Sequence, residues 1–132
     1  MNYRPKKVAV LGSGVMGSGI ACHLANVGMD VIMLDIVTPK LSDNDSKSKF
    51  HRNKLVNSAL QKTIKSKPAP LYHKSFSSRI KTGNFEDDFD KISESDWIIE
   101  VVVENLEIKK QIFEKVDKHR KNGSLVSSNT SS

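Results

Sequence analysis

Short apolar runs alternate with amphipathic segments along the first third of the chain. Val8–Leu11 is a continuous apolar run closed by glycine, which is typical of a strand buried on both faces of a parallel sheet. Small and apolar residues recur at helical spacing over Val15–Val27, and Gly28 stands where a left-handed helix terminator belongs. A second apolar run, Asp30–Leu34, ends at Asp35. The pattern predicts strand, helix and strand, the size of one βαβ unit.

The same alternation continues through the middle of the chain. A polar, breaker-rich stretch follows Asp35, and then a helix is predicted whose inward side is formed by Leu55, Val56, Ala59, Leu60 and Ile64. Pro68 and Pro70 are expected to end this helix, because proline lacks an amide hydrogen and restricts the residue before it. A short strand is expected over Arg79–Thr82. The acidic residues that follow are interpreted as ordinary surface on a turn or short helix: Glu86, Asp87, Asp88 and Asp90.

The last third predicts a strand, a helix and a further strand. Trp97–Val103 is rich in β-branched residues, and the helix expected over Asn105–Arg120 turns one set of residues inward. That set is Leu106, Ile112, Phe113 and Val116. Asn122 and Gly123 end the helix, and Leu125–Ser127 begins another strand. Strands alternating with helices predict an α/β fold, a doubly wound and mainly parallel sheet with helices on both faces.

Length and composition narrow the class of protein. A chain of 132 residues is expected to form one domain over 1–132. The sequence has no run long enough for a transmembrane segment and no signal-peptide core, which favours a cytoplasmic protein. Cys22 is the single cysteine, so an internal disulfide is excluded, and packing in the first helix is favoured over a reactive thiol. No group of residues shows metal-ligand spacing, so no metal is expected.

The formal charge of +6 is concentrated in one stretch. Eleven lysines and arginines lie between Lys40 and Lys81, against only Asp43 and Asp45. A solvated helix surface explains this, and so does a site for a polyanion such as the phosphates of coenzyme A or a nucleic acid. The stretch has few aromatic residues to stack bases and no recognised nucleic-acid motif, so a specific nucleic-acid partner is disfavoured.

The segment GSGVMG, residues 12–17, lies between the first predicted strand and the first predicted helix. Gly12 allows a tight turn, Gly14 lets the backbone approach a diphosphate, and Gly17 permits close packing of the helix. Backbone amides at the helix start, from Ser13, Val15 and Met16 onward, then face the diphosphate, where the helix dipole favours negative charge. This context predicts a Rossmann-like dinucleotide site.

Asp35 follows eighteen residues after Gly17, at the carboxyl end of the second predicted strand. Its two oxygens can accept both hydroxyls of the adenosine ribose, and a 2′-phosphate there would be repelled. Asp35 therefore favours NAD over NADP. A turn-capping aspartate and a methyltransferase that binds S-adenosylmethionine are the alternatives, but neither needs helix amides beneath a diphosphate.

Longer segments resemble one family. VAVLGSGVMGSGIACHLANVGMDVIMLDI, DWIIEVVVENLEIKKQIF and SSNTSS are similar to the NAD-binding domain of 3-hydroxyacyl-CoA dehydrogenases. RNKLVNSALQKTIKSKPAPLY and RIKTGNFEDD resemble the long bacterial members that act in fatty-acid β-oxidation, some of which also carry an enoyl-CoA hydratase region. The glycine loop is shared by many dehydrogenases, whereas VVVEN with a lysine five residues after the glutamate is much more restricted.

The resemblance implies roles for particular residues. Met16 and Asp35 would contact the adenosine half of the cofactor, and further residues would line the cofactor channel: Val102, Val103, Glu104 and Lys109. Without the family, Glu104 would be interpreted as a carboxylate at a helix N-terminus and Lys109 as a surface lysine. Ser131 would lie between the nicotinamide and the 3-hydroxyl of the substrate, with Asn129 fixing that loop.

The family's general base is a histidine oriented by a glutamate, and both are expected after Ser132. None of His23, His51, His73 and His119 is expected to replace that base. The chain alone is therefore expected to bind NAD(H) without turnover, while the full protein would oxidise 3-hydroxyacyl-CoA to 3-ketoacyl-CoA. The alternative is a non-catalytic NAD sensor or structural module of the same fold.

The resemblance also implies partners. A helical C-terminal domain would close over the acyl chain and support homo-oligomerisation in the full protein. Lys62, Lys65 and Lys67 are candidates for contact with the phosphorylated end of coenzyme A. Smaller family members have a CoA-contacting serine in this helix where the chain has Ala59, so the sequence departs from the family pattern there.

Overall fold

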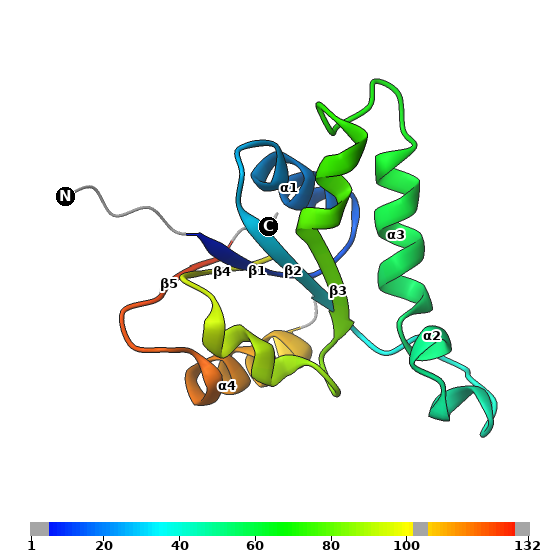
Figure 1. The fold of residues 1–132 in the computed structure, drawn as a ribbon. Coiled ribbons are helices and arrows are strands. Elements are labelled where there is room, and N and C mark those ends of the chain that lie inside the picture. The colour runs from blue at the N-terminus through cyan, green and yellow to red at the C-terminus, as the bar shows by residue number, and fades with distance from the viewer. Residues whose placement is uncertain (1–5, 102–105, 129–132) are drawn as a thin grey trace.

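Five parallel strands form the centre of the molecule. The structure is a computed structural model, and it describes residues 6–101 and 106–128. The strands are β1 (Lys7–Leu11), β2 (Asp30–Asp35), β3 (Ile80–Asn84), β4 (Trp97–Glu100) and β5 (Leu125–Ser128). They are ordered β3-β2-β1-β4-β5, and every neighbouring pair is parallel (Figure 1). The chain thus runs outward from β1 in one direction and then returns to build the other half of the sheet.

Helices cover both faces of this sheet, as the alternating pattern predicts. The α-helices are α1 (Val15–Asn26), α2 (Lys49–Arg52), α3 (Lys54–Ile64) and α4 (Leu106–His119), and the 3₁₀ helices are η1 (Asp45–Lys47), η2 (Lys74–Arg79) and η3 (Phe89–Glu94). In Figure 1, α1 and α3 lie on one side of the strands, and α4 lies on the other side with η3. The expected doubly wound α/β fold is confirmed.

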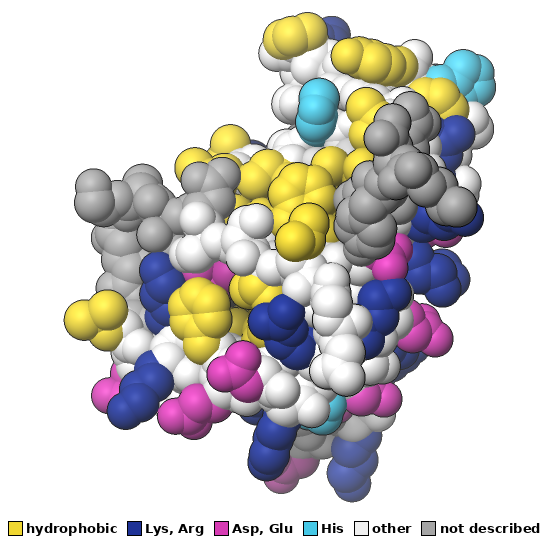
Figure 2. All heavy atoms as spheres, turned by 90° about the vertical axis from the view of Figure 1, so that its left-hand side faces the viewer, with side chains coloured by type: hydrophobic (Ala, Val, Ile, Leu, Met, Phe, Trp, Pro, Cys, Tyr) yellow, Lys and Arg dark blue, Asp and Glu magenta, His cyan; other side chains and the backbone are white. Residues whose placement is uncertain are grey.

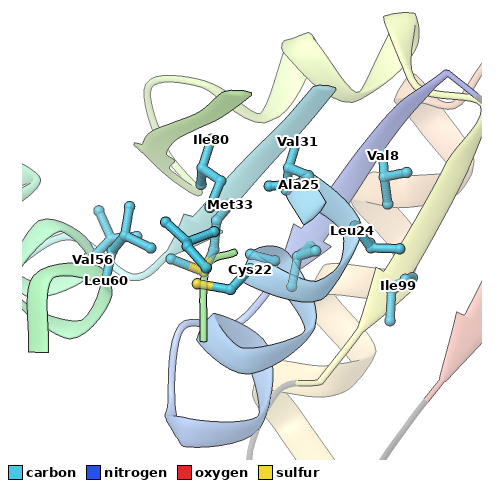
Figure 3. Packing of buried hydrophobic residues seen from close by; sticks show 13 residues of the cluster. Val8, Cys22, Leu24, Ala25, Val31, Met33, Val56, Leu60, Ile80 and Ile99 are labelled. Carbon is cyan, nitrogen blue, oxygen red and sulfur yellow. The ribbon is translucent and has the colours of Figure 1, made fainter. Parts of the chain in front are cut away.

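The larger apolar cluster joins α1 and α3 to one face of the sheet. Figure 3 shows Ala25 of α1 beside Val31 of β2 and Leu24 of α1 beside Ile99 of β4, with Val56 and Leu60 of α3 completing the layer. Cys22 is fully buried in this cluster, and burial raises the pKa of its thiol. The cysteine is therefore a packing residue, as the sequence predicts.

A second cluster fills the other face beneath α4 and η3. Ile112 and Val116 of α4 and Phe89 and Ile92 of η3 pack against alternate residues of the strands, such as Leu34. Because η3 is only six residues long, it is a much shorter cover than α1 provides on the other face.

Two expectations about side chains are wrong. Leu106, expected to turn inward, is 85% exposed at the first position of α4. Asp88 is not ordinary surface, because it is buried and accepts a hydrogen bond from the Asn84 amide at 2.9 Å. Asp87 is exposed as expected, and it accepts two hydrogen bonds from Arg52 at 2.8 and 3.0 Å. Asp87 also accepts a hydrogen bond from the Asn84 side chain at 2.9 Å, so this carboxylate joins the end of α2 to the end of β3.

Element boundaries differ from the sequence prediction by a few residues. The strand predicted as Trp97–Val103 ends at Glu100, and Val102 and Val103 lie outside the described residues. The middle helix ends at Ile64, before the prolines rather than at them. Gly28 has a positive φ of 94° directly after the cap of α1 and ends that helix as expected. Gly123 also has a positive φ, 83°, but α4 already ends at His119, so Gly123 belongs to the turn before β5 and does not end the helix.

The basic charge is not spread over the whole surface. Figure 2 shows the side of the molecule turned away from α3, and there Lys and Arg side chains alternate with Asp and Glu in the lower half. The sequence places the excess of positive charge in residues 40–81, which include α2 and α3. Over residues 6–101 and 106–128, no helix is long and apolar enough to cross a membrane.

Candidate dinucleotide site

The three glycines of GSGVMG lie at the bend between β1 and α1, Gly12 and Gly14 in the bend itself and Gly17 in the first turn of α1, and each has a different steric environment. Gly12 has a φ of 118°, and a Cβ there would lie 3.0 Å from the Val101 oxygen. A Cβ on Gly17 would lie 1.9 Å from the Gly12 oxygen, inside any tolerable contact. Around Gly14, no atom lies within 4 Å of the position that a Cβ would take. These environments agree with the turn, the close packing and the open approach that the sequence predicts.

The start of α1 is open to a ligand. The helix is capped by Gly14, which provides no side-chain hydrogen bond, and its first turn contains no acidic residue. Val15 is 90% exposed and Met16 is 46% exposed. The first amides of a helix have no acceptor within the helix and favour negative charge, so this end suits a diphosphate.

Asp35 lies beside this bend, at the end of the neighbouring strand β2. Its Oδ2 accepts hydrogen bonds from the Ser13 amide at 2.8 Å and from the Ser13 hydroxyl at 2.5 Å. Its Oδ1 accepts a hydrogen bond from the Ile36 amide at 2.7 Å. The carboxylate is therefore fixed against the glycine loop, next to the place where the sugar attached to a bound diphosphate would lie. Ser13 was predicted as a cofactor-binding residue whose amide faces the diphosphate. Its amide and its hydroxyl both donate to Asp35 Oδ2 instead, so this amide is turned to the carboxylate, a contact that the sequence did not predict.

The remaining predicted cofactor residues fall into two groups. Lys109 lies in α4, and its Nζ is 3.8 Å from Oε2 of the buried Glu100, which the sequence did not single out. Four residues lie outside the described part of the chain: Val102, Val103, Glu104 and Ser131. Asn129 lies outside it as well. Contact of any of these residues with a cofactor stays a prediction.

The candidate CoA lysines lie far from the glycine loop. Lys62 is in the last turn of α3, and Lys65 and Lys67 follow the helix; all three are exposed. The chain just beyond them is held by Asn26, the last residue of α1, which donates a hydrogen bond to the Pro70 oxygen at 2.8 Å. The glycine loop is at the other end of α1, roughly 18 Å away for a helix of twelve residues. The structure does not bring these lysines to the dinucleotide site.

A cavity of about 810 Å³ lies at the opposite ends of the strands. It is lined in part by the first residues of three strands, Lys7, Asp30 and Ile80, and by the end of η3. None of the predicted site residues lines it. Within the described residues, no group of three histidine, cysteine or carboxylate side chains could hold a metal ion.

Comparison with known proteins identifies the family. The sequence profile of the family described as "3-hydroxyacyl-CoA dehydrogenase, NAD binding domain" matches residues 7–132. The chain belongs to this family. The resemblance stated from the motifs is thereby confirmed, and so is NAD as the cofactor of the domain. The glycine bend, the open helix start and the fixed Asp35 carboxylate are the parts of the structure that fit this cofactor.

Individual relatives agree with the family. A probable 3-hydroxyacyl-CoA dehydrogenase of Bacillus subtilis is 56% identical over 99% of the chain. A putative fatty acid oxidation complex trifunctional enzyme of Rickettsia felis is 42% identical, also over 99%. The crystal structure of the (S)-3-hydroxybutyryl-CoA dehydrogenase PaaH1 from Ralstonia eutropha superposes with a TM-score of 0.65 at 30% identity, over 98% of the chain. The chain spans 17% of the length of the Bacillus and Rickettsia proteins and 42% of the Ralstonia chain.

Proposed function

We propose that this chain is the cofactor-binding part of an enzyme that oxidises 3-hydroxyacyl-CoA to 3-ketoacyl-CoA in fatty-acid β-oxidation. The observation that carries the proposal is the Asp35 carboxylate held by Ser13 against the glycine bend. In a dinucleotide, the diphosphate is bonded to the adenosine ribose, so one molecule could place its diphosphate at the α1 amides and its ribose at Asp35. The family membership supports NAD as that dinucleotide. Residues 1–132 would form one NAD-binding domain.

The protein's own residues would bind and orient the reactants. Gly14, Val15 and Met16 would present the backbone to the diphosphate, and Asp35 would accept the ribose hydroxyls. The residues beyond β4, β5 and the start of α4 would line the nicotinamide half: Val102, Val103, Glu104, Lys109 and Ser131. When bound, NAD supplies the acceptor for the hydride that leaves C3 of the substrate.

Oxidation at C3 also releases the proton of the 3-hydroxyl, which must pass to a base. The family's histidine and glutamate would come after Ser132, in a sequence region that the longer relatives have room to contain. The chain alone is therefore expected to bind NAD(H) without turnover. A C-terminal helical domain, homo-oligomer formation and a cytoplasmic location complete the proposal for the full protein.

Lys62, Lys65 and Lys67 are proposed to attract the phosphates of coenzyme A. Their support is the excess of positive charge on α2 and α3 and their exposure. Because they lie about one helix length from the glycine loop, they would meet the far end of an extended acyl-CoA and not the reacting carbon.

The cofactor assignment is tested by calorimetric titration of the chain with NADH and NADPH. NADH is expected to bind at least tenfold more tightly than NADPH, since a 2′-phosphate would face the Asp35 carboxylate. Asp35→Ala should reduce this preference. Asp30→Ala is the matched control, because Asp30 is exposed at the opposite end of the same strand. Equal affinity of the unaltered chain for the two cofactors would remove the argument from the ribose carboxylate.

The catalytic part of the proposal needs a second assay. NADH formation from 3-hydroxybutyryl-CoA should be undetectable with residues 1–132 and measurable with the full-length protein. Turnover by the short chain would show that a base lies within it, and its absence from the full-length protein would favour a non-catalytic NAD-binding module.

A further inference from the structure

The carboxylate of Glu100 is buried at the end of β4, the edge of the sheet where the candidate site lies. Its relative exposure is 0%, the lowest of any acidic residue that the structure describes. It belongs to an otherwise apolar strand, and the next residue, Val101, packs against the Gly12 turn. A buried carboxylate is unfavourable unless hydrogen bonds and opposite charge compensate it, so a polar residue at this position needs a reason.

Two other elements contribute groups to this carboxylate. The Ser128 hydroxyl donates a hydrogen bond to Glu100 Oε2 at 2.7 Å, and the two residues are register partners between β5 and β4. The Lys109 Nζ of α4 lies 3.8 Å from the same oxygen, a separation that marks an ion pair rather than a direct hydrogen bond. Glu100 thus joins β5 and α4 through side chains that lie far apart in the sequence.

The two partners of Glu100, Lys109 and Ser128, are related to residues of the proposed cofactor site. Lys109 is a proposed cofactor-channel residue, and Ser128 comes three residues before Ser131. A lysine side chain loses rotamer entropy when it is fixed, and a partner that holds it in advance spares the ligand that entropy.

We propose that Glu100 is a positioning residue, which fixes Lys109 and the end of β5 so that both are in place for the dinucleotide. This inference rests on the proposed NAD-binding function and deepens it. It assigns Glu100 no contact with substrate or cofactor. It also predicts coupling: the effect of Glu100 on cofactor affinity must act largely through Lys109.

A positioning role and a purely electrostatic role predict opposite signs. If the carboxylate acted only by its charge, Glu100→Gln would make the site more positive and would strengthen binding of the anionic NADH. If it holds Lys109 in place, the same substitution should weaken binding, because the lysine is no longer fixed. The glutamine keeps the volume and can still accept the hydrogen bond from Ser128, so the strand pairing is preserved.

The experiment measures NADH affinity by the change in nicotinamide fluorescence for five forms of the chain. They are the unaltered chain, Glu100→Gln, Lys109→Met, the double variant, and Lys110→Met, an exposed neighbour on the same helix that serves as the control. Glu100→Gln and Lys109→Met are each expected to weaken binding by roughly threefold to tenfold, from the entropy of one long side chain. In the Lys109→Met background, Glu100→Gln should change the affinity by less than about twofold.

Thermal unfolding of the same variants separates positioning from a general loss of structure. Lys109→Met leaves a buried carboxylate with less compensation, so it should unfold at a lower temperature than Lys110→Met. The double variant removes both charges, so its unfolding temperature should lie above that of Lys109→Met. The comparison of these two variants tests the coupling even if Glu100→Gln alone folds poorly.

The outcomes are distinct. Failure of the unaltered chain to bind NADH would refute the proposed function, and this inference with it. Normal binding by the unaltered chain together with unchanged or tighter binding by Glu100→Gln would overturn the inference alone. Independent, multiplicative losses in the double variant would also overturn it, because they would show that Glu100 does not act through Lys109.

Discussion

Replacing Gly17 by alanine should destabilise the protein although alanine is the better helix former. The added Cβ would lie 1.9 Å from the Gly12 carbonyl oxygen and 3.0 Å from a methyl group of Val101. To bring the first distance to 3.0 Å, the helix or the turn must move by about 1.1 Å, the difference of these values. The nearest group is the backbone carbonyl of the buried Gly12, so a rotamer change cannot relieve this contact.

The size of the effect follows from two opposing terms. Alanine gains about 1 kcal/mol over glycine inside a helix. Overpacking against rigid neighbours costs about 1–3 kcal/mol, and a backbone contact this short belongs at the upper end. Gly17→Ala should therefore lower the free energy of unfolding by about 2 kcal/mol.

Gly19→Ala is the matched control, since no atom lies within 4 Å of a Cβ at that position of the same helix. It should raise the free energy of unfolding by up to about 1 kcal/mol. Urea unfolding followed by circular dichroism should separate the two variants by about 1–2 M in midpoint. Equal midpoints would refute the argument that α1 is held against the Gly12 turn at this residue.

Three further predictions follow from other parts of the structure. Gly14→Ala should weaken NADH binding by roughly tenfold or more in calorimetry with little change in the urea midpoint, because its Cβ meets no protein atom but occupies the approach to α1. Lys121, and then the backbone amides of Lys6 and Lys7, lower the pKa of Asp96 from 3.8 to about 2. The stabilisation from Asp96 should be present above pH 4 and be lost as the pH falls toward 2, and urea titrations should show a flatter dependence in Asp96→Asn. Burial raises the pKa of the Cys22 thiol, so a thiol reagent at pH 8 should react with the unfolded chain and hardly at all with the native one.

Local patterns were enough to predict most elements of this fold. β1, β2 and β4 are short, mostly apolar runs, and the longer helices have a periodic apolar side, so these elements can be recognised without knowledge of the rest of the chain. The short elements η1, α2 and η2 have no such pattern and were not predicted. The errors come from contacts between distant residues. Asp87 is exposed as predicted, but its ion pair with Arg52 was not foreseen because Arg52 lies 35 residues earlier. Leu106 has the correct spacing for an inward residue, but it is the first residue of its helix and lies beyond the edge of the core.

In the candidate site, too, the local sequence patterns were predicted and the contacts between distant residues were not. The glycine spacing and the acid after β2 are local signals, and they identified the dinucleotide site from the sequence. The hydrogen bonds from Ser13 to Asp35 cross 22 residues, and the pairing of Glu100 with Ser128 crosses 28. Glu100 was passed over because a single carboxylate within WIIEVVV does not break the pattern of a buried strand. Only the register of β4 with β5 shows that this residue has a hydroxyl opposite it.

The topology of the sheet explains why these polar pairs gather at one edge. The chain leaves β1 toward β2 and β3, and later returns to the other side of β1 through β4 and β5. The connections therefore diverge at the carboxyl end of β1, which opens a crevice there in a doubly wound sheet. Asp35 comes from one half of the sheet and Glu100 from the other, and each is fixed by a serine. One carboxylate is half-buried beside the crevice, where it can accept hydroxyls, and the other is fully buried, where it can only hold its neighbours. Under the two proposals, the same side-chain chemistry would serve recognition of the ribose in one half of the sheet and positioning of Lys109 in the other, and the burial of each carboxylate decides which role it can have.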